Sequence, residues 1–220
     1  MLSYTTHLCL YDVRLRLPIW VRGHVHPGTT QKLTDRHDEF HQDDSLRDAD
    51  LVHPQAYADW NKANPDDKMD LGHGFGSQNR RRSPLEQHDI DVMTNVWPER
   101  PGMNRKTKQL AEGHIVELGN DPKTRKLIVT NGPGFDLGKS VQWMPDGPAI
   151  PHFSWVHVLC ETSTSIKMWA FIFPNVEDCE LQQVSTNELS DRLGFEVCDN
   201  MNSGRGITAK KSKLKPWWKP

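Results

Sequence analysis

The fold is decided by residues 70–104, which read DLGHGFGSQNRRRSPLEQHDIDVMTNVWPERPGMN. The stretch begins with Asp70-Leu71-Gly72-His73, passes through Asn95 and ends at Asn104, where a charged helical stretch opens. An imidazole titrates near neutral pH and can take a proton from water, and amide oxygens are among the ligands that Mg²⁺ accepts. One histidine, two asparagines and the downstream Glu112 therefore indicate hydrolysis assisted by a single divalent metal ion.

The size of the chain predicts one folded domain with a tail. With 220 residues and 35% hydrophobic content, the chain can bury one good core. We expect this domain to span residues 1–202 and the tail to span residues 203–220. No apolar run approaches the roughly 18 residues of a membrane span, and residues 1–10 lack a basic leader. These features favour a cytoplasmic protein with no membrane partner.

The charge is distributed unevenly. The net charge of −2 argues against a protein that coats nucleic acid in general. Residues 203–220 hold six basic residues and no acid, so the remaining body has 21 basic and 29 acidic residues, a net charge of −8. With Trp217 and Trp218, this tail has the composition to hold a phosphate backbone and stack on bases. The alternative is a solvated, disordered terminus.

The cysteines and the remaining histidines give no standard metal motif. Cys9, Cys160, Cys179 and Cys198 lack the paired spacing of a structural zinc site. A disulfide between Cys179 and Cys198 and a fully reduced state both remain open. A separate hypothesis, a histidine-rich metal-binding module, would use His24, His26, His37 and His41.

Periodicity predicts a mixed α+β fold with a mainly antiparallel sheet. Residues 11–26 are predicted as a half-exposed strand or hairpin at one edge of the sheet, and residues 27–70 as a long irregular segment. The further strands are predicted at 89–97, 127–130, 153–160 and 167–173, with a turn at 131–134. The helices are predicted at 54–63, 104–118 and 186–193.

Six motifs in fixed order carry a resemblance to a known family. They are DLGHG (70–74), MTNVWPERPGMN (93–104), LIVTNGPGF (127–135), IPHFSWVHVLCE (150–161), WAFIFPN (169–175) and VSTNELSDRLGF (184–195). Together with DEFHQDDSL (38–46), they resemble the DNA/RNA non-specific endonucleases of the ββα-metal (His-Me finger) fold. The resemblance covers residues 10–200 and implies that fold, with a central sheet flanked by helices.

The resemblance assigns two central roles. His73 holds the position of the general base in the family's Asp-Arg-Gly-His motif, and without the resemblance it would be interpreted as a structural histidine. Asn104 matches the metal-binding asparagine, whose amide oxygen and waters suit Mg²⁺. A helix cap is the ordinary role of such an asparagine, and the two roles can coexist.

Three further residues receive weaker assignments. Glu112 matches a helix glutamate that acts through metal-bound water, because eight helical residues advance about 12 Å and direct ligation together with Asn104 would be strained. Asn95 matches an asparagine near the scissile phosphate, and its alternative is a turn residue at a strand end. Asp91 stands where the family often has another polar residue.

The chain also departs from the family pattern. Leu71 replaces the arginine of the motif, a cation implied to hold the phosphate. We expect Arg36 to contribute a phosphate contact and the triplet Arg80, Arg81 and Arg82 to follow the nucleic-acid backbone, although such a triplet can also be a solvated face. Glu99 replaces a usual Gln, Lys108 replaces a frequent Trp, and Phe75-Gly76 replaces Pro-Ala.

The resemblance implies a Mg²⁺-dependent endonuclease that cleaves DNA and RNA with little sequence preference and leaves 5′-phosphates, with Mn²⁺ as a substitute ion. Homodimers are common in the family, and a toxin member would need a cognate inhibitor protein. The loss of arginine at Leu71 motivates an alternative, a nuclease-fold protein that binds nucleic acid without turnover.

Overall fold

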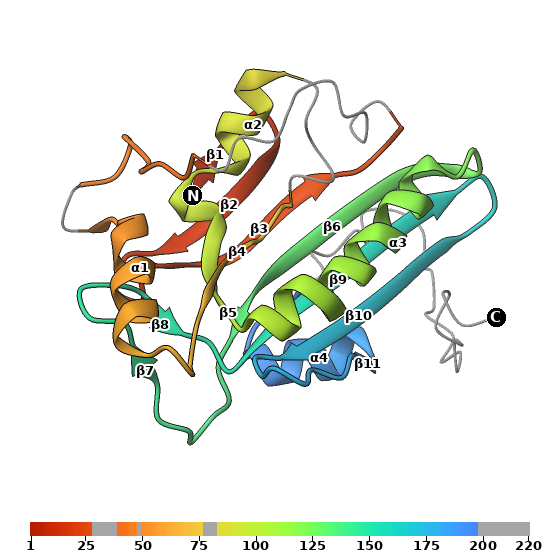
Figure 1. The fold of residues 1–220 in the computed structure, drawn as a ribbon. Coiled ribbons are helices and arrows are strands. Elements are labelled where there is room, and N and C mark those ends of the chain that lie inside the picture. The colour runs from red at the N-terminus through yellow and green to blue at the C-terminus, as the bar shows by residue number, and fades with distance from the viewer. Residues whose placement is uncertain (28–38, 48–49, 77–82, 198–220) are drawn as a thin grey trace.

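A seven-stranded antiparallel sheet forms the body of the protein in the computed structural model, which describes residues 1–27, 39–47, 50–76 and 83–197 (Figure 1). The spatial order of its strands is β1-β2-β3-β6-β9-β10-β11. Their bounds are Leu2–Ser3, His7–Asp12, Leu17–His24, Thr124–Gly134, Phe153–Thr162, Ile166–Pro174 and Gln182–Val184. The mixed α+β architecture with a mainly antiparallel sheet is confirmed.

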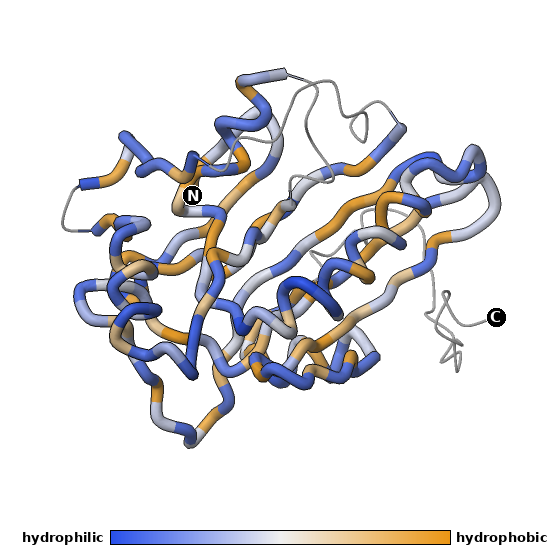
Figure 2. The backbone as a smooth tube through the Cα atoms, viewed as in Figure 1, coloured by the Kyte–Doolittle hydropathy of each residue, from blue (hydrophilic) through white to orange (hydrophobic). Residues whose placement is uncertain are grey.

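The two faces of this sheet carry separate apolar clusters because side chains alternate along each strand. Along β9, Val156 and Val158 point to the main cluster, whereas Trp155 points to the opposite one. Figure 2 shows orange segments recurring along the central strands, while α1 (Pro54–Ala63) and α4 (Thr186–Leu193) are mainly blue. Helix α4 covers the Trp155 face, where its Leu189 is fully buried.

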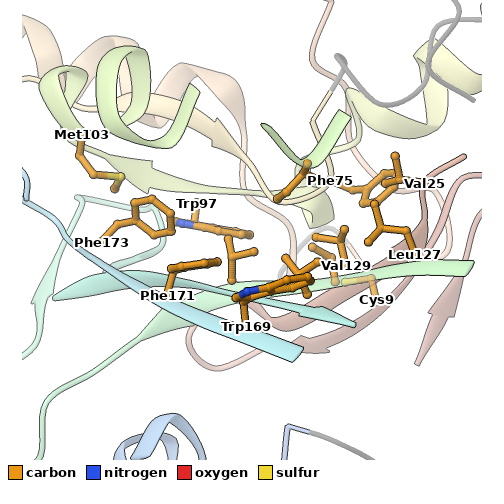
Figure 3. Close-up of a cluster of buried hydrophobic side chains, with 14 of the residues drawn as sticks. Cys9, Val25, Phe75, Trp97, Met103, Leu127, Val129, Trp169, Phe171 and Phe173 are labelled. Atoms are coloured by element: carbon orange, nitrogen blue, oxygen red, sulfur yellow. The ribbon is translucent and has the colours of Figure 1, made fainter. Parts of the chain in front are cut away.

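The main cluster is covered by a hairpin and the helix that follows it. Strands β4 (Asp70–His73) and β5 (Val96–Glu99) pair antiparallel, and a π-helical turn η4 (Met103–Lys108) leads into α3 (Gln109–Asn120). Trp97 of β5 and Met103 of η4 pack against Phe171 and Phe173 of the sheet, as Figure 3 shows. Burial of these large side chains fixes the hairpin and the helix onto the sheet.

Three short elements complete the fold. Helix α2 spans Pro84–Ile90, and the 3₁₀ turn η3 spans Met93–Asn95. Strands β7 (Gln142–Trp143) and β8 (Ala149–Ile150) form a separate two-stranded sheet. Helix α2 begins after Ser83, whose hydroxyl accepts a hydrogen bond from the Glu86 amide, with Pro84 as its first residue. Within the described residues, no helix is long and apolar enough to cross a membrane.

Several predicted elements are confirmed. Helix α1 spans residues 54–63 as predicted, and α4 spans residues 186–193, with Ser185 and Glu188 in a reciprocal capping box and Gly194 in the left-handed conformation. The helix expected at 104–118 is present as η4 and α3, and β9 and β10 lie where strands were predicted. Residues 11–26 contribute to the β2–β3 hairpin.

Three sequence predictions are wrong. Residues 89–97 do not form one strand, because α2 extends to Ile90 and η3 intervenes before β5. Residues 131–134 do not form a turn but continue β6, where Pro133 pairs with Ser154 of β9. The sheet edge is formed by β1, because β2 and β3 both have a neighbour on each side.

Candidate active site

His73 ends β4 and lies beside a buried carboxylate. Its Nε2 is 3.0 Å from Oδ1 of Asp91, and 11% of its side chain is exposed. Because an ionised carboxylate can only accept hydrogen bonds, the contact assigns the proton to Nε2 and leaves Nδ1 with its lone pair. His73 therefore has one ring nitrogen left as an acceptor, which is the feature that a general base requires.

Asp91 is itself held in place from two directions. It lies at the C-terminal end of α2, is almost fully buried, and its Oδ2 accepts a hydrogen bond of 2.5 Å from Nε2 of Gln87. The main chain at Asp91 accepts from the amide of His41 at 3.2 Å. The carboxylate thus has a fixed position, and it can stabilise a positive charge that develops on His73.

The segment around residues 39–47 covers the site from the side. His41 forms a parallel bridge with Val92, and the preceding Phe40 places its ring 5.0 Å from the His73 ring. Asp43 accepts hydrogen bonds from Ser45, Tyr4 and Thr94. Although burial raises the pKa of the Asp43 carboxyl, these hydrogen bonds outweigh it and hold that pKa below its usual range. The DEFHQDDSL motif therefore supplies residues that pack beside His73 and hydrogen-bond to the turn around Thr94.

Asn95 ties down the chain that follows His73. Its Oδ1 accepts from the Phe75 amide at 2.8 Å, and its Nδ2 donates to the carbonyls of Phe75 at 3.0 Å and Ile90 at 2.9 Å. Its main-chain oxygen accepts from the Gly74 amide at 2.7 Å. The side chain is fully buried, and its hydrogen bonds fix the main chain that follows the DLGH motif.

Asn104 lies in η4 and contacts the first residue of the motif. Its Nδ2 donates to Oδ2 of Asp70 at 3.1 Å, so Oδ1 is the acceptor atom that it offers. Arg105 donates to the same carboxylate through Nε at 2.7 Å and Nη2 at 2.6 Å. A half-buried amide oxygen beside a neutralised carboxylate suits an ion that keeps most of its water, as Mg²⁺ does.

Glu112 faces the loop that follows His73. A Cβ atom built on Gly76 would lie 3.2 Å from its Oε2, which places the carboxylate against a residue three positions after His73. Glu112 is half-buried and lies on α3, one continuous helical stretch after Asn104. The pairing of β4 with β5, followed by η4 and α3, therefore sets Asn104 against Asp70 at the start of β4 and Glu112 against the residues that follow His73 at its end.

Other predicted site residues lie elsewhere or outside the described residues. Arg36 and the triplet Arg80, Arg81 and Arg82 lie outside them, as do Cys198, His37 and the tail at 203–220. Leu71 packs against a second apolar cluster around Tyr57 and Trp60. Within the described part of the chain, no three His, Cys, Asp or Glu side chains form a metal-binding group.

The sequence did not indicate the partners of these residues. Asp91 was expected only as a polar position, and the contacts of Gln87, Phe40 and Arg105 were not predicted. The pairing of His73 with Asp91 depends on how α2 folds back, and eighteen residues separate the two in the chain. The capping signal Ser83-Pro84 with Glu86 was the local feature that could have revealed α2.

A two-stranded hairpin followed by a helix, with a histidine on the hairpin and an asparagine on the helix, is the arrangement of ββα-metal nucleases. The fold of one such protein matches here: the crystal structure of the EndoG/EndoGI complex superposes with a TM-score of 0.76 over 88% of this chain and 83% of that chain, at 22% identity. The profile of the DNA/RNA non-specific endonuclease family matches residues 1–204. The chain belongs to this family.

The chain is also similar in sequence to mitochondrial endonuclease G. The human and bovine proteins are each 27% identical to this chain in an alignment 184 residues long that covers 79% of this chain. The alignment spans 59% of the human protein and 58% of the bovine one, so the chain spans about three fifths of the length of these relatives. The family is named for cleavage of DNA and RNA, so its members act on nucleic acids.

Proposed function

We propose that the protein is a Mg²⁺-dependent endonuclease that cleaves DNA and RNA with little sequence preference and leaves 5′-phosphates. The observation that carries the proposal is the His73–Asp91 contact at the end of β4, with Asn104 on the adjoining helix. A histidine with one ring nitrogen left as an acceptor supports the assignment of a general base, and the amide oxygen on the adjoining helix supports the assignment of a ligand for a hard cation.

His73 performs the proton transfer in this mechanism. Its Nδ1 accepts a proton from a water molecule as the water oxygen attacks phosphorus, and Asp91 stabilises the resulting imidazolium through Nε2. The bond from phosphorus to the 3′ oxygen breaks, and that oxygen takes a proton from solvent. The new phosphate oxygen stays on the 5′ side, which gives a 5′-phosphate and a 3′-hydroxyl.

Asn104 and Glu112 would hold the metal ion, Asn104 through Oδ1 and Glu112 through water. When bound, Mg²⁺ or the substitute Mn²⁺ supplies charge neutralisation at the phosphate and the leaving oxygen. Asn95 contributes by fixing Gly74 and Phe75, so we assign it a positioning role rather than a phosphate contact.

The missing motif arginine needs a replacement. Leu71 contributes to an apolar cluster, whereas Arg105 is bonded to Asp70 of the same motif and has 69% of its side chain exposed. We assign a phosphate contact to Arg105, joined by Arg36, and a role along the backbone to Arg80, Arg81 and Arg82. A guanidinium suits phosphate because its donors are planar and permanently charged.

Further partners follow from the same proposal. The domain 1–202 would act on the phosphodiester, and the basic residues of 203–220 would add affinity for nucleic acid. Because the structural neighbour was solved as a complex that concerns EndoG inhibition, we include an inhibitor protein and a homodimer among the expected partners. A cytoplasmic location also remains a proposal.

The deciding experiment incubates supercoiled plasmid with the wild type and with His73→Ala, with and without Mg²⁺ or Mn²⁺. Metal-dependent nicking by the wild type alone, with both proteins giving the same circular dichroism spectrum, supports the proposal. The partly buried Leu71 packs against an apolar cluster and supplies no cation at the motif position, which favours the second candidate, a binding protein without turnover. That protein would shift the plasmid in a gel and leave it intact with either metal ion.

A further inference from the structure

Two departures from the family pattern meet in the structure. Nζ of Lys108 lies 2.7 Å from Oε1 of Glu99, and both side chains are essentially excluded from solvent. Glu99 ends β5 and Lys108 ends η4, so the pair joins the hairpin to the helix under the active site. A buried charge without a partner is strongly destabilising, which means that each of these residues requires the other.

The ammonium has a second partner in the site itself. Nζ of Lys108 donates to the main-chain oxygen of His73 at 2.6 Å. It also lies 4.7 Å from the centre of the Trp97 ring, whose face attracts a cation. His73 is therefore held at its ring by Asp91 and at its carbonyl by Lys108.

Glu99 is held just as firmly. Its Oε1 also accepts from the hydroxyl of Ser154 at 2.7 Å, and that hydroxyl accepts from Nε1 of Trp97 at 2.8 Å. Its Oε2 is buried without a hydrogen-bond partner among the described residues. A Cβ atom at Gly72 would clash with this carboxylate, so the glycine of the motif is required by the position of Glu99.

We propose that Lys108 is a positioning residue for the His73 base, kept charged inside the protein by Glu99, and that its ammonium fixes the His73 peptide for proton transfer. The role rests on the function proposed above for His73. A buried ion pair is a poor source of net stability, since apolar or neutral residues of similar size often serve as well. The hydrogen bond from Lys108 to the His73 carbonyl explains why a charged pair is present where stability alone would not require one.

The experiment separates positioning from stability with the variants Glu99→Gln, Lys108→Met and their double combination. We expect each single variant to lose roughly 10 °C in melting temperature because one charge stays buried, and the double variant to return to within a few degrees of the wild type. The double variant should still show kcat about tenfold lower, with KM changed less than twofold. Its His73 ring resonances should move in ¹H–¹³C NMR spectra.

Lys106→Met is the matched control, because Lys106 is an exposed lysine of the same turn. It should leave the melting temperature, kcat and the His73 resonances unchanged. Glu99→Asp is a milder variant that keeps both charges and shortens the acidic side chain by one methylene. It should move the His73 resonances and lower kcat about threefold, and it serves where the double variant does not fold.

Two results would overturn the positioning role. The first is a double variant with restored stability, wild-type kcat and unmoved His73 resonances. The second is the same unmoved resonances and wild-type kcat in Glu99→Asp. Absence of cleavage by the wild type would contradict the proposed function instead, and the NMR comparison of His73 would then decide the positioning role by itself.

Discussion

His73 and His157 lie on opposite sides of the seven-stranded sheet, and their neighbours carry opposite charges. His73 is near the surface with a carboxylate at its Nε2, whereas His157 of β9 is buried beside Arg22 on the face covered by α4. Burial and the Arg22 charge lower the pKa of His157 to about 4. The difference shows that the neighbours of a histidine, and not its residue type, decide which chemistry its ring can perform.

The strongest test of this comparison removes each imidazole in turn. We expect His73→Ala to lower kcat about 10³-fold, within the range of general-base contributions, with an unchanged melting curve. His157→Gln is the matched control, and its kcat at pH 7.5 should stay within threefold of the wild type. The initial rate of plasmid nicking measures both. Equal losses in the two variants would show that the distinction between the two faces is wrong.

The second test uses acid stability. Because the folded pKa of His157 is below its usual value near 6.5, the unfolded chain binds more protons between pH 6.5 and pH 4. The contribution to folding stability is therefore fully present above pH 6.5 and falls as pH drops towards 4, by up to about 3 kcal/mol. Urea unfolding at pH 7 and pH 4.5 should show a smaller loss in His157→Gln. The same loss in both proteins would contradict the assignment.

The third test removes the charge next to His73 and keeps the shape. Asp91→Asn should lower kcat about 10²-fold, because an amide no longer stabilises the imidazolium. Asp89→Asn is the control: Asp89 is a neighbouring carboxylate that accepts from the Thr5 amide at 2.7 Å, whereas the carboxylate hydrogen-bonded to His73 is that of Asp91. Steady-state rates on a labelled duplex measure both. A similar effect from Asp89→Asn would point to a general loss of packing.

The smallest expected effect concerns the metal ion. Asn104→Ala should raise the Mg²⁺ concentration for half-maximal rate about tenfold, since it removes the amide oxygen that we assign as ligand. A Mg²⁺ titration of the cleavage rate measures it, with Gln109→Ala, an exposed position at the start of α3, as the control. An unchanged titration would place the ion at other residues.

Local signals explain which elements could be predicted. Pro54 starts α1, and the Ser185–Glu188 box and Gly194 bound α4, so both helices could be predicted from neighbouring residues alone. The turn expected at 131–134 failed because tertiary pairing overrode its Gly and Pro residues. The pairing between β3 and β6 ends at Asn131, so at Pro133 strand β6 pairs with β9 alone. Because proline has no N–H to donate, it is tolerated there without the loss of a hydrogen bond to β3.

In the site, too, local sequence indicated individual residues but not the contacts that the tertiary fold creates between them. The resemblance proposed His73, Asn104 and Glu112 as site residues, and their placement along β4, η4 and α3 depends on the pairing of β4 with β5. The contact between His73 and Asp91 could not be predicted, because it requires α2 and η3 to return the chain to β4. Glu99 and Lys108 were noted as separate departures, and only the folded structure reveals that they are partners.

The Glu99–Lys108 pair also bears on how this sequence could have arisen. Stepwise change from the family's usual Gln and Trp would pass through a protein with one charge buried alone. Such an intermediate would be less stable than either end point, which disfavours change at one position at a time. We expect positions 99 and 108 to be inherited as a unit in the descendants of this chain, with Gly72 as a third position that cannot drift while the carboxylate is present.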